Sequence, residues 1–276
     1  MRFLRQQLPH RGHRGAVILL RCGRCHSRGS QRRYACPFGL VMPPYLFYNV
    51  RMNWNLFTGE RAGADALLLA GFAKDARGIC GADLGCGSGI LLLLLLLGDD
   101  ARHMTGVELR ESAAESAREN LRAFVLEARG EIVCADYRSA PFEAGSLDFI
   151  VSNPPYFPAG HGAVSPDAAR AAQRTESATV FELCAAAARY LKRGGQFFLV
   201  HRLDREKDVL AALREADLTP VRRRDVFSAP GKRAPIFLIE AVKDAPECAV
   251  RHESILLRGA DGRETEEYRK ICHWEA

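Results

Sequence analysis

The amino-acid sequence predicts an α/β fold, with a mostly parallel sheet and helices on both of its faces. Short apolar runs alternate with stretches of helical periodicity between residues 60 and 245. A glycine-rich turn, "GCGSG", directly follows the first of these apolar runs. No repeat or low-complexity linker interrupts the series, so the sequence indicates one domain.

Seven strands are expected, separated by helices. The strands are expected at 78–85, 102–109, 131–136, 147–153, 196–201, 219–227 and 234–242. The helices are expected at 64–76, 88–97, 110–128, 179–195 and 205–217. The alternation predicts parallel pairing for the first five strands. The last two strands surround "SAPGKRAP", which indicates an antiparallel terminal hairpin at the edge of the sheet.

The charge of the chain is unevenly distributed. Ten arginines precede Glu60, which is the first acidic residue. Without them, 29 of the 39 basic residues remain beside 33 acidic ones, a net charge of −4. Nucleic-acid binding by this mildly acidic body therefore needs a local basic patch or the basic head.

Residues 1–41 are expected to lie outside the main domain, which we place at residues 42–276. They are rich in Arg, Gly, Cys, His and Ser and show no helical or strand periodicity. Three interpretations fit this composition. The segment is a disordered basic arm that binds phosphates, a targeting peptide, or translated upstream sequence with the true start at Met42 or Met52.

The cysteines and the hydropathy indicate a cytoplasmic protein. The nine cysteines form no visible pairing framework, which favours free thiols in a reducing compartment. "CGRCH" matches a c-type haem attachment pattern, but haem attachment needs export and zinc lacks a second pair of ligands, so we expect no metal. The longest apolar run, 90–97, is far shorter than the roughly 18 residues of a membrane span. We expect a buried helix there, no membrane partner, and a monomer.

The glycine-rich turn lies where a ligand is expected. Ligands of open parallel sheets bind beyond the carboxyl ends of the strands, and Gly85, Gly87 and Gly89 let the backbone come close to one. The G-x-G-x-G spacing, with Cys86 between the first two glycines, differs from the G-x-G-x-x-G of dinucleotide sites. Asp83 precedes the turn, and its carboxylate would repel a pyrophosphate but can bind an ammonium group.

Two further acids end the next two strands. Glu108, 23 residues after Gly85, can accept hydrogen bonds from both hydroxyls of a ribose. Asp136 ends the third strand and can accept one from an adenine amino group. An ammonium, a ribose and an adenine along three successive strand ends describe S-adenosyl-L-methionine, which we expect as the cofactor.

The fourth strand ends in Asn153-Pro154-Pro155-Tyr156, for which we expect the catalytic role. An amino nitrogen that attacks a methyl group has a delocalised lone pair, so acceptors must hold its hydrogens. The Asn153 side-chain oxygen and the Pro154 carbonyl suit that task, because the prolines fix φ and bring no amide donors. Tyr156 offers a face for stacking, worth about 1–3 kcal/mol per base. Positioning is then the main catalytic contribution, and no strong base is required.

With these motifs the sequence resembles the class I methyltransferases that modify amino nitrogens, whose signature is (N/D)-P-P-(Y/F). More closely it resembles the bacterial tRNA1(Val) (adenine(37)-N6)-methyltransferase family. The resemblance covers about residues 55–272, including "DLGCGSGI", "SNPPYF", "LKRGGQFFLVHR" and "PGKRAPIFLIEAVK". It implies a Rossmann-like fold, S-adenosyl-L-methionine, a tRNA substrate, cofactor contacts from the three acids and the glycine turn, and base contacts from residues 153–156. One departure is "AGAD" at 62–65, where the family usually has Phe-Gly-Thr-Asp.

A tRNA substrate requires cations near the site. The candidates lie on the terminal hairpin and after the loop "FPAGHGAVSPDAA", which could close over a flipped base. They are Arg170, Arg174, Arg222, Arg223, Arg224, Lys232 and Arg233. Solvated surface charge is the alternative interpretation of each.

Three other functions fit parts of the sequence. Protein glutamine N5-methyltransferases share the Asn-Pro-Pro-Tyr site but carry a helical domain before the glycine loop, and only about 40 residues separate Met42 from Asp83. Another nucleic-acid amino methyltransferase fits the same motif. A catalytically idle RNA-binding module is disfavoured by the intact motif. The "PGKRAP" hairpin and the tail "DGRETEEYRKI" at 261–271 favour the tRNA enzymes.

Overall fold

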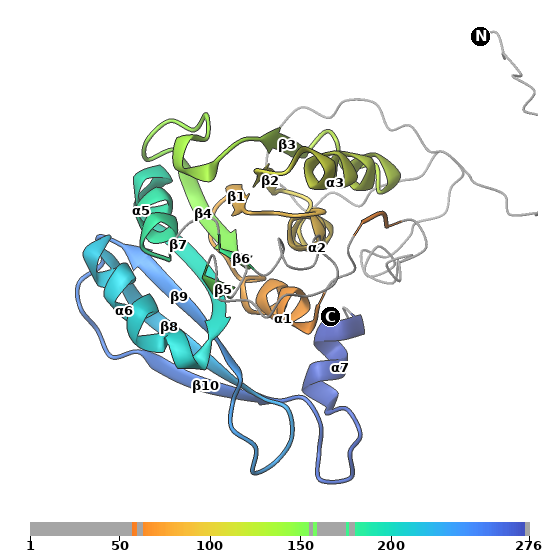
Figure 1. The fold of residues 1–276 in the computed structure, drawn as a ribbon, viewed down its shortest axis with the longest axis vertical. Coiled ribbons are helices and arrows are strands. Elements are labelled where there is room, and N and C mark those ends of the chain that lie inside the picture. The colour runs from red at the N-terminus through yellow and green to blue at the C-terminus, as the bar shows by residue number, and fades with distance from the viewer. Residues whose placement is uncertain (1–56, 60–62, 155–156, 159–174, 177–179, 274–276) are drawn as a thin grey trace, which may run out of the picture. The chain divides into compact units, whose positions relative to one another are not determined.

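A computed structural model describes residues 57–59, 63–154, 157–158, 175–176 and 180–273 of the chain (Figure 1). Several expectations concern residues outside these ranges. They are the arginine-rich segment at 1–41 (the basic head), the alternative translation starts at Met42 and Met52, Pro155 and Tyr156 of the catalytic motif, and Arg170 and Arg174.

An eight-stranded sheet forms the centre of the described residues, in the order β10-β8-β9-β7-β4-β1-β2-β3. Its strands are β1 (Cys80–Leu84), β2 (His103–Glu108), β3 (Gly130–Cys134), β4 (Leu147–Ser152), β7 (Leu191–Arg202), β8 (Leu218–Phe227), β9 (Ile236–Lys243) and β10 (Arg251–Leu256). Every neighbouring pair is parallel except those of β9, which runs antiparallel to β7 and β8. The mostly parallel sheet and its antiparallel terminal hairpin are therefore confirmed.

Helices cover both faces of the sheet (Figure 1). They are α1 (Ala64–Phe72), α2 (Ile90–Gly98), α3 (Glu111–Ala123), α5 (Val180–Tyr190), α6 (Glu206–Glu215) and α7 (Glu266–His273). The first three and α7 pack on one face, while α5 and α6 pack on the other. Successive strand residues point to opposite faces, so Phe197 joins the core under α5 and α6, and Phe198 joins the core under α1.

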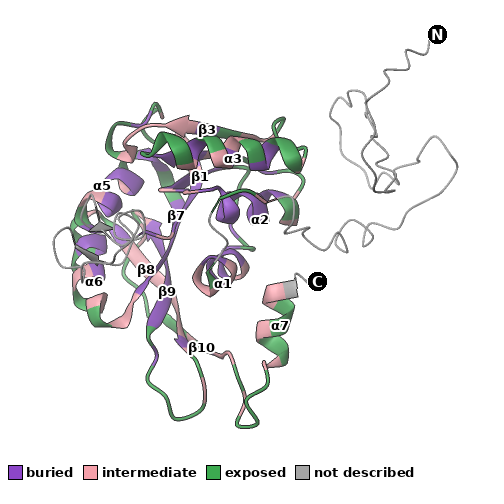
Figure 2. Cartoon of the chain, turned by 45° about the vertical axis from the view of Figure 1, so that its right-hand side comes forward, coloured by how far each residue is buried: buried purple, intermediate pink, exposed green. Residues whose placement is uncertain are grey.

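The leucine-rich helix α2 lies inside the molecule, as the sequence predicts. Each residue from Ile90 to Leu96 is at most 8% exposed, and Figure 2 shows this helix in the colour of buried residues. A helix that is apolar all round needs such full enclosure. Within the described ranges no helix has the length and hydropathy needed to cross a bilayer. The cysteines of those ranges are free thiols.

The structure differs from the sequence prediction in the number of strands and in several boundaries. The sheet has eight strands where seven were expected, α1 ends at Phe72 and not at residue 76, and α3 ends at Ala123 and not at residue 128. The helix expected to reach Gly195 ends at Tyr190, and β7 already begins at Leu191, which pairs with Leu147 of β4. Tyr190 is fully buried and its hydroxyl donates to the Tyr137 carbonyl at 3.0 Å, which fixes the end of the helix. The terminal hairpin is also not the edge of the sheet, because β10 pairs in parallel with β8.

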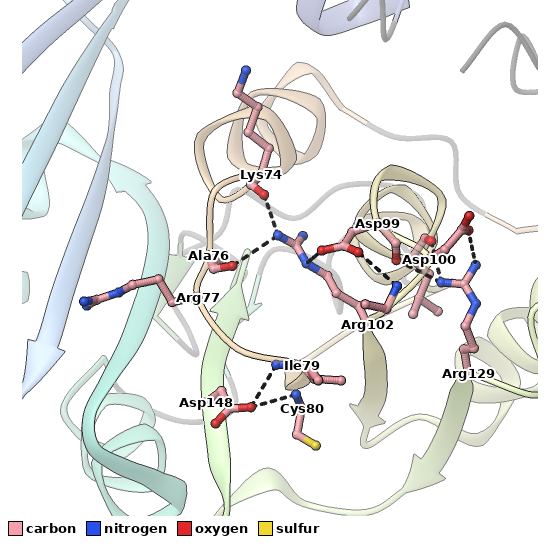
Figure 3. Close-up of polar contacts among 12 residues, drawn as sticks. Lys74, Ala76, Arg77, Ile79, Cys80, Asp99, Asp100, Arg102, Arg129 and Asp148 are labelled. Carbon is pink, nitrogen blue, oxygen red and sulfur yellow. Dashed lines mark hydrogen bonds and ion pairs between the residues drawn. The ribbon is translucent and has the colours of Figure 1, made fainter. Parts of the chain in front are cut away.

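An arginine clamp stabilises the edge of the sheet where β1 begins (Figure 3). Arg102 is 2% exposed, and its Nη2 donates to the carbonyls of Lys74 and Ala76 just beyond α1. Its Nε lies 3.4 Å from Asp99 Oδ2, and its guanidinium lies 5.3 Å from the centroid of the Phe149 ring. This buried cation satisfies two carbonyls of the turn that follows α1.

Candidate active site

The carboxyl ends of the parallel strands lie along the edge of the sheet opposite the arginine clamp. Parallel pairing of β1, β2, β3, β4 and β7 places Leu84, Glu108, Cys134, Ser152 and Arg202 along this edge. The sequence-predicted acids and Asn153 therefore come together on one side of the sheet. This is the position at which open parallel sheets bind ligands.

The glycine turn leaves open space beside the end of β1. Gly85 and Gly87 adopt φ values of +77° and +55°, and a Cβ built on either residue meets no atom within 4 Å. The amides of Gly85 and Cys86 both donate to the Val107 carbonyl, at 2.8 and 3.0 Å, which ties the turn to β2. The turn is therefore held in place by β2, and its glycine backbone is open to a ligand. We call this open turn the cradle.

Cys86 and Gly89, also in the turn, pack against neighbouring elements. The Cys86 side chain is buried, and a Cβ on Gly106 would lie 2.8 Å from its sulfur. Burial raises the pKa of the Cys86 thiol well above its ordinary value. Gly89, with φ +82°, faces α3, where a Cβ would come within 3.1 Å of Ala117 Cβ. The Cys86 thiol is therefore buried, and it donates a 3.8 Å hydrogen bond to the Gly87 carbonyl.

Asp83 is a buried carboxyl at the end of β1. It is 1% exposed, and its Oδ2 has no hydrogen-bond partner in the described part of the chain. Burial chiefly, with a smaller contribution from Glu108, raises the pKa of Asp83 to about 8, against a lowering by the backbone of Leu92. A buried oxygen without a partner is costly, so it indicates a donor that belongs to a ligand.

Glu108 links the glycine turn to the end of β2. Its Oε2 accepts from the Gly87 amide at 2.9 Å, and its Oε1 accepts from the Arg110 amide at 3.0 Å. Arg110 Nε lies 3.3 Å from the same oxygen. Each carboxylate oxygen offers about two acceptor sites, so Oε2 retains capacity for a ligand hydroxyl while it holds the turn.

Asp136 is fixed by an arginine that the sequence analysis did not single out. Its Oδ1 accepts from the Arg138 amide at 2.9 Å, and its Oδ2 lies 2.5 Å from Arg138 Nη2. Arg138 also contacts Glu182 of α5 at 2.8 Å. The hydrogen bond from Arg138 lowers the pKa of Asp136, so this carboxylate stays ionised as an acceptor.

The catalytic motif begins on the strand next to the glycine turn. Val151 of β4 pairs with Asp83 of β1, and the Ser152 hydroxyl donates to the Leu84 carbonyl at 2.6 Å. Asn153 follows and is half-buried, whereas Pro154 is buried. Beyond the motif, β5 (Phe157–Pro158) pairs with β6 (Thr175–Glu176) in a separate two-stranded sheet.

Sequence reasoning missed a buried asparagine that holds the chain before α1. Asn120 of α3 is fully buried, and its Oδ1 accepts from the Thr58 amide at 2.7 Å. Its Nδ2 donates to the carbonyls of Thr58 and Ser88, both at 2.9 Å. The available signal was a polar residue on the apolar face of α3, next to Leu121.

The arginines of β8 are engaged within the sheet. The Arg222 side chain is 12% exposed, and its Nε donates to Glu240 at 2.8 Å while its Nη2 donates to the Phe72 carbonyl at 2.7 Å. Its guanidinium also lies 4.0 Å from the centroid of the Phe72 ring. The position of Arg222 is structural, so we do not retain it as a phosphate contact.

Arg223 and Arg224 are engaged in a similar way. Arg223 is 12% exposed and pairs with Asp225 at 2.8 Å and with Glu206. Arg224 pairs with Glu253 at 2.6 Å. Lys232 and Arg233 differ, because both are exposed in the loop between β8 and β9 and have no ion-pair partner in the ranges that the structure describes.

The sheet order and the open glycine turn define a Rossmann-like methyltransferase. The chain belongs to the methyltransferase small domain family, whose model matches residues 49–216. S-adenosyl-L-methionine is the cofactor, and the site fits it: Asp83 offers a buried oxygen for an ammonium, and the open cradle at Gly85 and Gly87 admits a ligand close to the backbone.

Within that family, the curated relatives are named tRNA1(Val) (adenine(37)-N6)-methyltransferase. The relative from Aeromonas salmonicida is 33% identical over 220 residues, which are 77% of this chain and 89% of the relative. That from Tolumonas auensis is 32% identical over 75% of this chain and 86% of its own length. That from Bacteroides fragilis is 27% identical over 83% of this chain and 95% of its own length.

A solved structure shares the fold. It is described as a predicted O-methyltransferase from Agrobacterium tumefaciens, and it aligns with a TM-score of 0.62 at 21% sequence identity. The alignment covers 77% of this chain and 97% of that one. This likeness supports the Rossmann-like fold of the described domain.

Proposed function

We propose that this protein transfers the methyl group of S-adenosyl-L-methionine to the exocyclic N6 of an adenine in tRNA, the adenine next to the anticodon of tRNA(Val). The observation that carries the proposal is the position of Asn153, one strand away from the open glycine turn and joined to it by the Ser152–Leu84 hydrogen bond. The names of the curated relatives support the substrate.

The first three strand ends are proposed to hold the cofactor. Asp83 would accept from the ammonium of its amino-acid part, and Glu108 would accept from its ribose hydroxyls. Asp136, held ionised by Arg138, would accept from its adenine amino group. When bound, the cofactor supplies a methyl group on a positively charged sulfur, which an amino nitrogen can attack directly.

The residues after β4 are proposed to orient the target base. The Asn153 side-chain oxygen and the Pro154 carbonyl would accept the two hydrogens of N6, so that its lone pair faces the methyl group. Tyr156 would stack on the base, and Pro155 would keep the backbone between them rigid. The nitrogen loses its proton after the transfer, so this arrangement catalyses by orientation.

We also propose a cellular location, an oligomeric state, domain bounds and phosphate contacts for this enzyme. A tRNA substrate places the enzyme in the cytoplasm, where we propose that it acts as a monomer. The main domain is proposed to span residues 42–276, with the basic head before it. Lys232 and Arg233 are proposed as phosphate contacts, as are Arg170 and Arg174, which lie outside the described residues.

Labelled S-adenosyl-L-methionine tests the proposal. Total tRNA that lacks the modification and a mixture of translation proteins are each incubated with the wild type and with Asn153→Ala. The proposal expects N6-methyladenosine as the only labelled nucleoside after digestion, at least 100-fold less of it with the variant, and unchanged cofactor binding. Label on a protein glutamine, with unlabelled RNA, would assign the chain to the glutamine N5-methyltransferases instead.

A further inference from the structure

A hollow lies on the edge of the sheet that carries the candidate active site. It has a volume of about 360 Å³ and lies between the end of β7 and the loop that joins β8 to β9. Its walls are residues 202–204 on one side and residues 233–236 on the other. The Leu203 amide donates to the Pro235 carbonyl at 3.0 Å, which holds the two walls together.

The hollow is close to the proposed position of the target base. Ser152, the residue before Asn153, pairs with Leu199 on the neighbouring strand β7. Arg202 follows three residues later on the same strand, which corresponds to about 10 Å along a strand. Stacked nucleotides are about 3.4 Å apart, so a strand whose adenine lies at Asn153 reaches the hollow within a few nucleotides.

The hollow is lined by the exposed cation Arg233, and Lys232 precedes it in the loop just outside the lining. Arg202 is paired with Asp204, with 3.0 Å between Nε and Oδ1, so these two wall residues neutralise each other. Arg233 and Lys232 are exposed and have no ion-pair partner in the described ranges, and the loop at 228–235 contains no acidic residue. Figures 1 and 2 show this loop projecting from the sheet beside the loop after β10, and no described helix or strand covers it.

We propose that this hollow binds a backbone phosphate of a nucleotide that flanks the methylated adenine. Arg233 and Lys232 contact the phosphate, and the Arg202–Asp204 pair forms the opposite wall. The ligand class follows from chemistry: two free cations next to a site for a flat base match the charge of a nucleic-acid strand. This inference rests on the proposed function, and it assigns the tRNA contact to a particular loop of an otherwise acidic body.

The test uses a variant that carries both Lys232→Ala and Arg233→Ala in the full chain. We expect kcat/KM for tRNA to fall about tenfold or more, since each lost contact is a charge-assisted hydrogen bond. The slope of log kcat/KM against log salt should become shallower by about 0.7, which corresponds to one phosphate that is no longer neutralised. Affinity for S-adenosyl-L-methionine should not change, because both residues lie away from the glycine turn.

A matched control removes the same charge from the opposite edge of the sheet. Arg193, at the start of β7, and Arg214, at the end of α6, are exposed and lack ion-pair partners among the described residues. The variant with Arg193→Ala and Arg214→Ala should keep tRNA kcat/KM within twofold of wild type. An equal loss in this control would show a general charge effect and overturn the proposal.

A phosphate scan locates the contact. Stem-loop substrates carry one neutral methylphosphonate at each position around the target adenosine. We expect a methylphosphonate at one position to lower wild-type kcat/KM about tenfold and to have no further effect in the Lys232→Ala, Arg233→Ala variant. Equal sensitivity of the variant and the wild type at every position would overturn the proposal. A wild type that methylates no tRNA would instead refute the proposed function on which it rests.

Discussion

The Gly87 amide donates a 2.9 Å hydrogen bond to Oε2 of Glu108, and this contact joins the glycine turn of the first strand to the end of the second. Glu108 therefore has two tasks, since the same carboxylate is proposed to bind the cofactor ribose. A carboxylate that shapes the turn before the ligand arrives binds that ligand with less reorganisation.

The first prediction concerns this carboxylate. Glu108→Ala should weaken cofactor binding by about 10- to 100-fold, because hydrogen bonds to a charged group contribute about 1.5–3 kcal/mol. Isothermal titration calorimetry with S-adenosyl-L-methionine measures this loss. Glu111→Ala, which removes a 70%-exposed carboxylate only three residues away, is the control and should bind normally. Equal affinities of wild type and Glu108→Ala would exclude Glu108 from the site.

The second prediction concerns the raised pKa of Asp83. The carboxyl ionises near 3.8 in an unfolded chain and near 8 in the folded protein, mainly because it is buried. The folded state therefore binds more protons between these values, so the contribution of Asp83 to stability is largest at low pH and is lost as pH rises towards 8. Asp83→Asn should be more stable than wild type above pH 8 in thermal unfolding without ligand.

Cofactor binding should show the opposite trend with pH. An ammonium ligand needs the ionised carboxylate, so affinity should rise about tenfold per pH unit up to about 8, with one proton released. Asp83→Asn should bind weakly and lose this dependence. 5′-Methylthioadenosine lacks the ammonium and serves as a ligand control. A pH-independent wild-type affinity for S-adenosyl-L-methionine would contradict the role of Asp83.

The third prediction tests the arginine clamp on the opposite edge. Arg102→Met should lower the free energy of unfolding by about 2–4 kcal/mol, because one buried and one partly buried carbonyl after α1 lose their donor. Denaturant unfolding measures the change. Arg122→Met, on the exposed face of α3, should cost less than about 1 kcal/mol. At a temperature where the Arg102→Met protein stays folded, methyl transfer should be unaffected, since the clamp is remote from the active site.

Short-range patterns predicted which side chains lie together at the carboxyl ends of the strands. Asp83, Glu108 and Asn153 each follow an apolar run, and parallel strands bring such positions to one edge without any knowledge of side-chain packing. Seven of the eight strands of the sheet were predicted for the same reason, because their periodicity is a property of the local sequence, whereas β10 was missed.

Contacts between distant segments were not predictable in this way. Asn120 binds Thr58 across 62 residues, and Arg222 binds the Phe72 carbonyl across 150. Such contacts depend on how α1 and α3 pack on the sheet, which no local pattern encodes. Arg222 and Arg223 belong to a run of three arginines, and for this reason the sequence suggested a phosphate-binding surface. In the fold, however, both side chains pair with acidic residues of the same chain.

The most direct test of the central claim is methylation of a tRNA(Val) transcript in two versions. One has adenosine next to the anticodon, and the other has guanosine at that single position. The account predicts about one methyl group per adenosine transcript, recovered as N6-methyladenosine, and none on the guanosine transcript. Equal labelling of both transcripts, or no labelling of either, would contradict it.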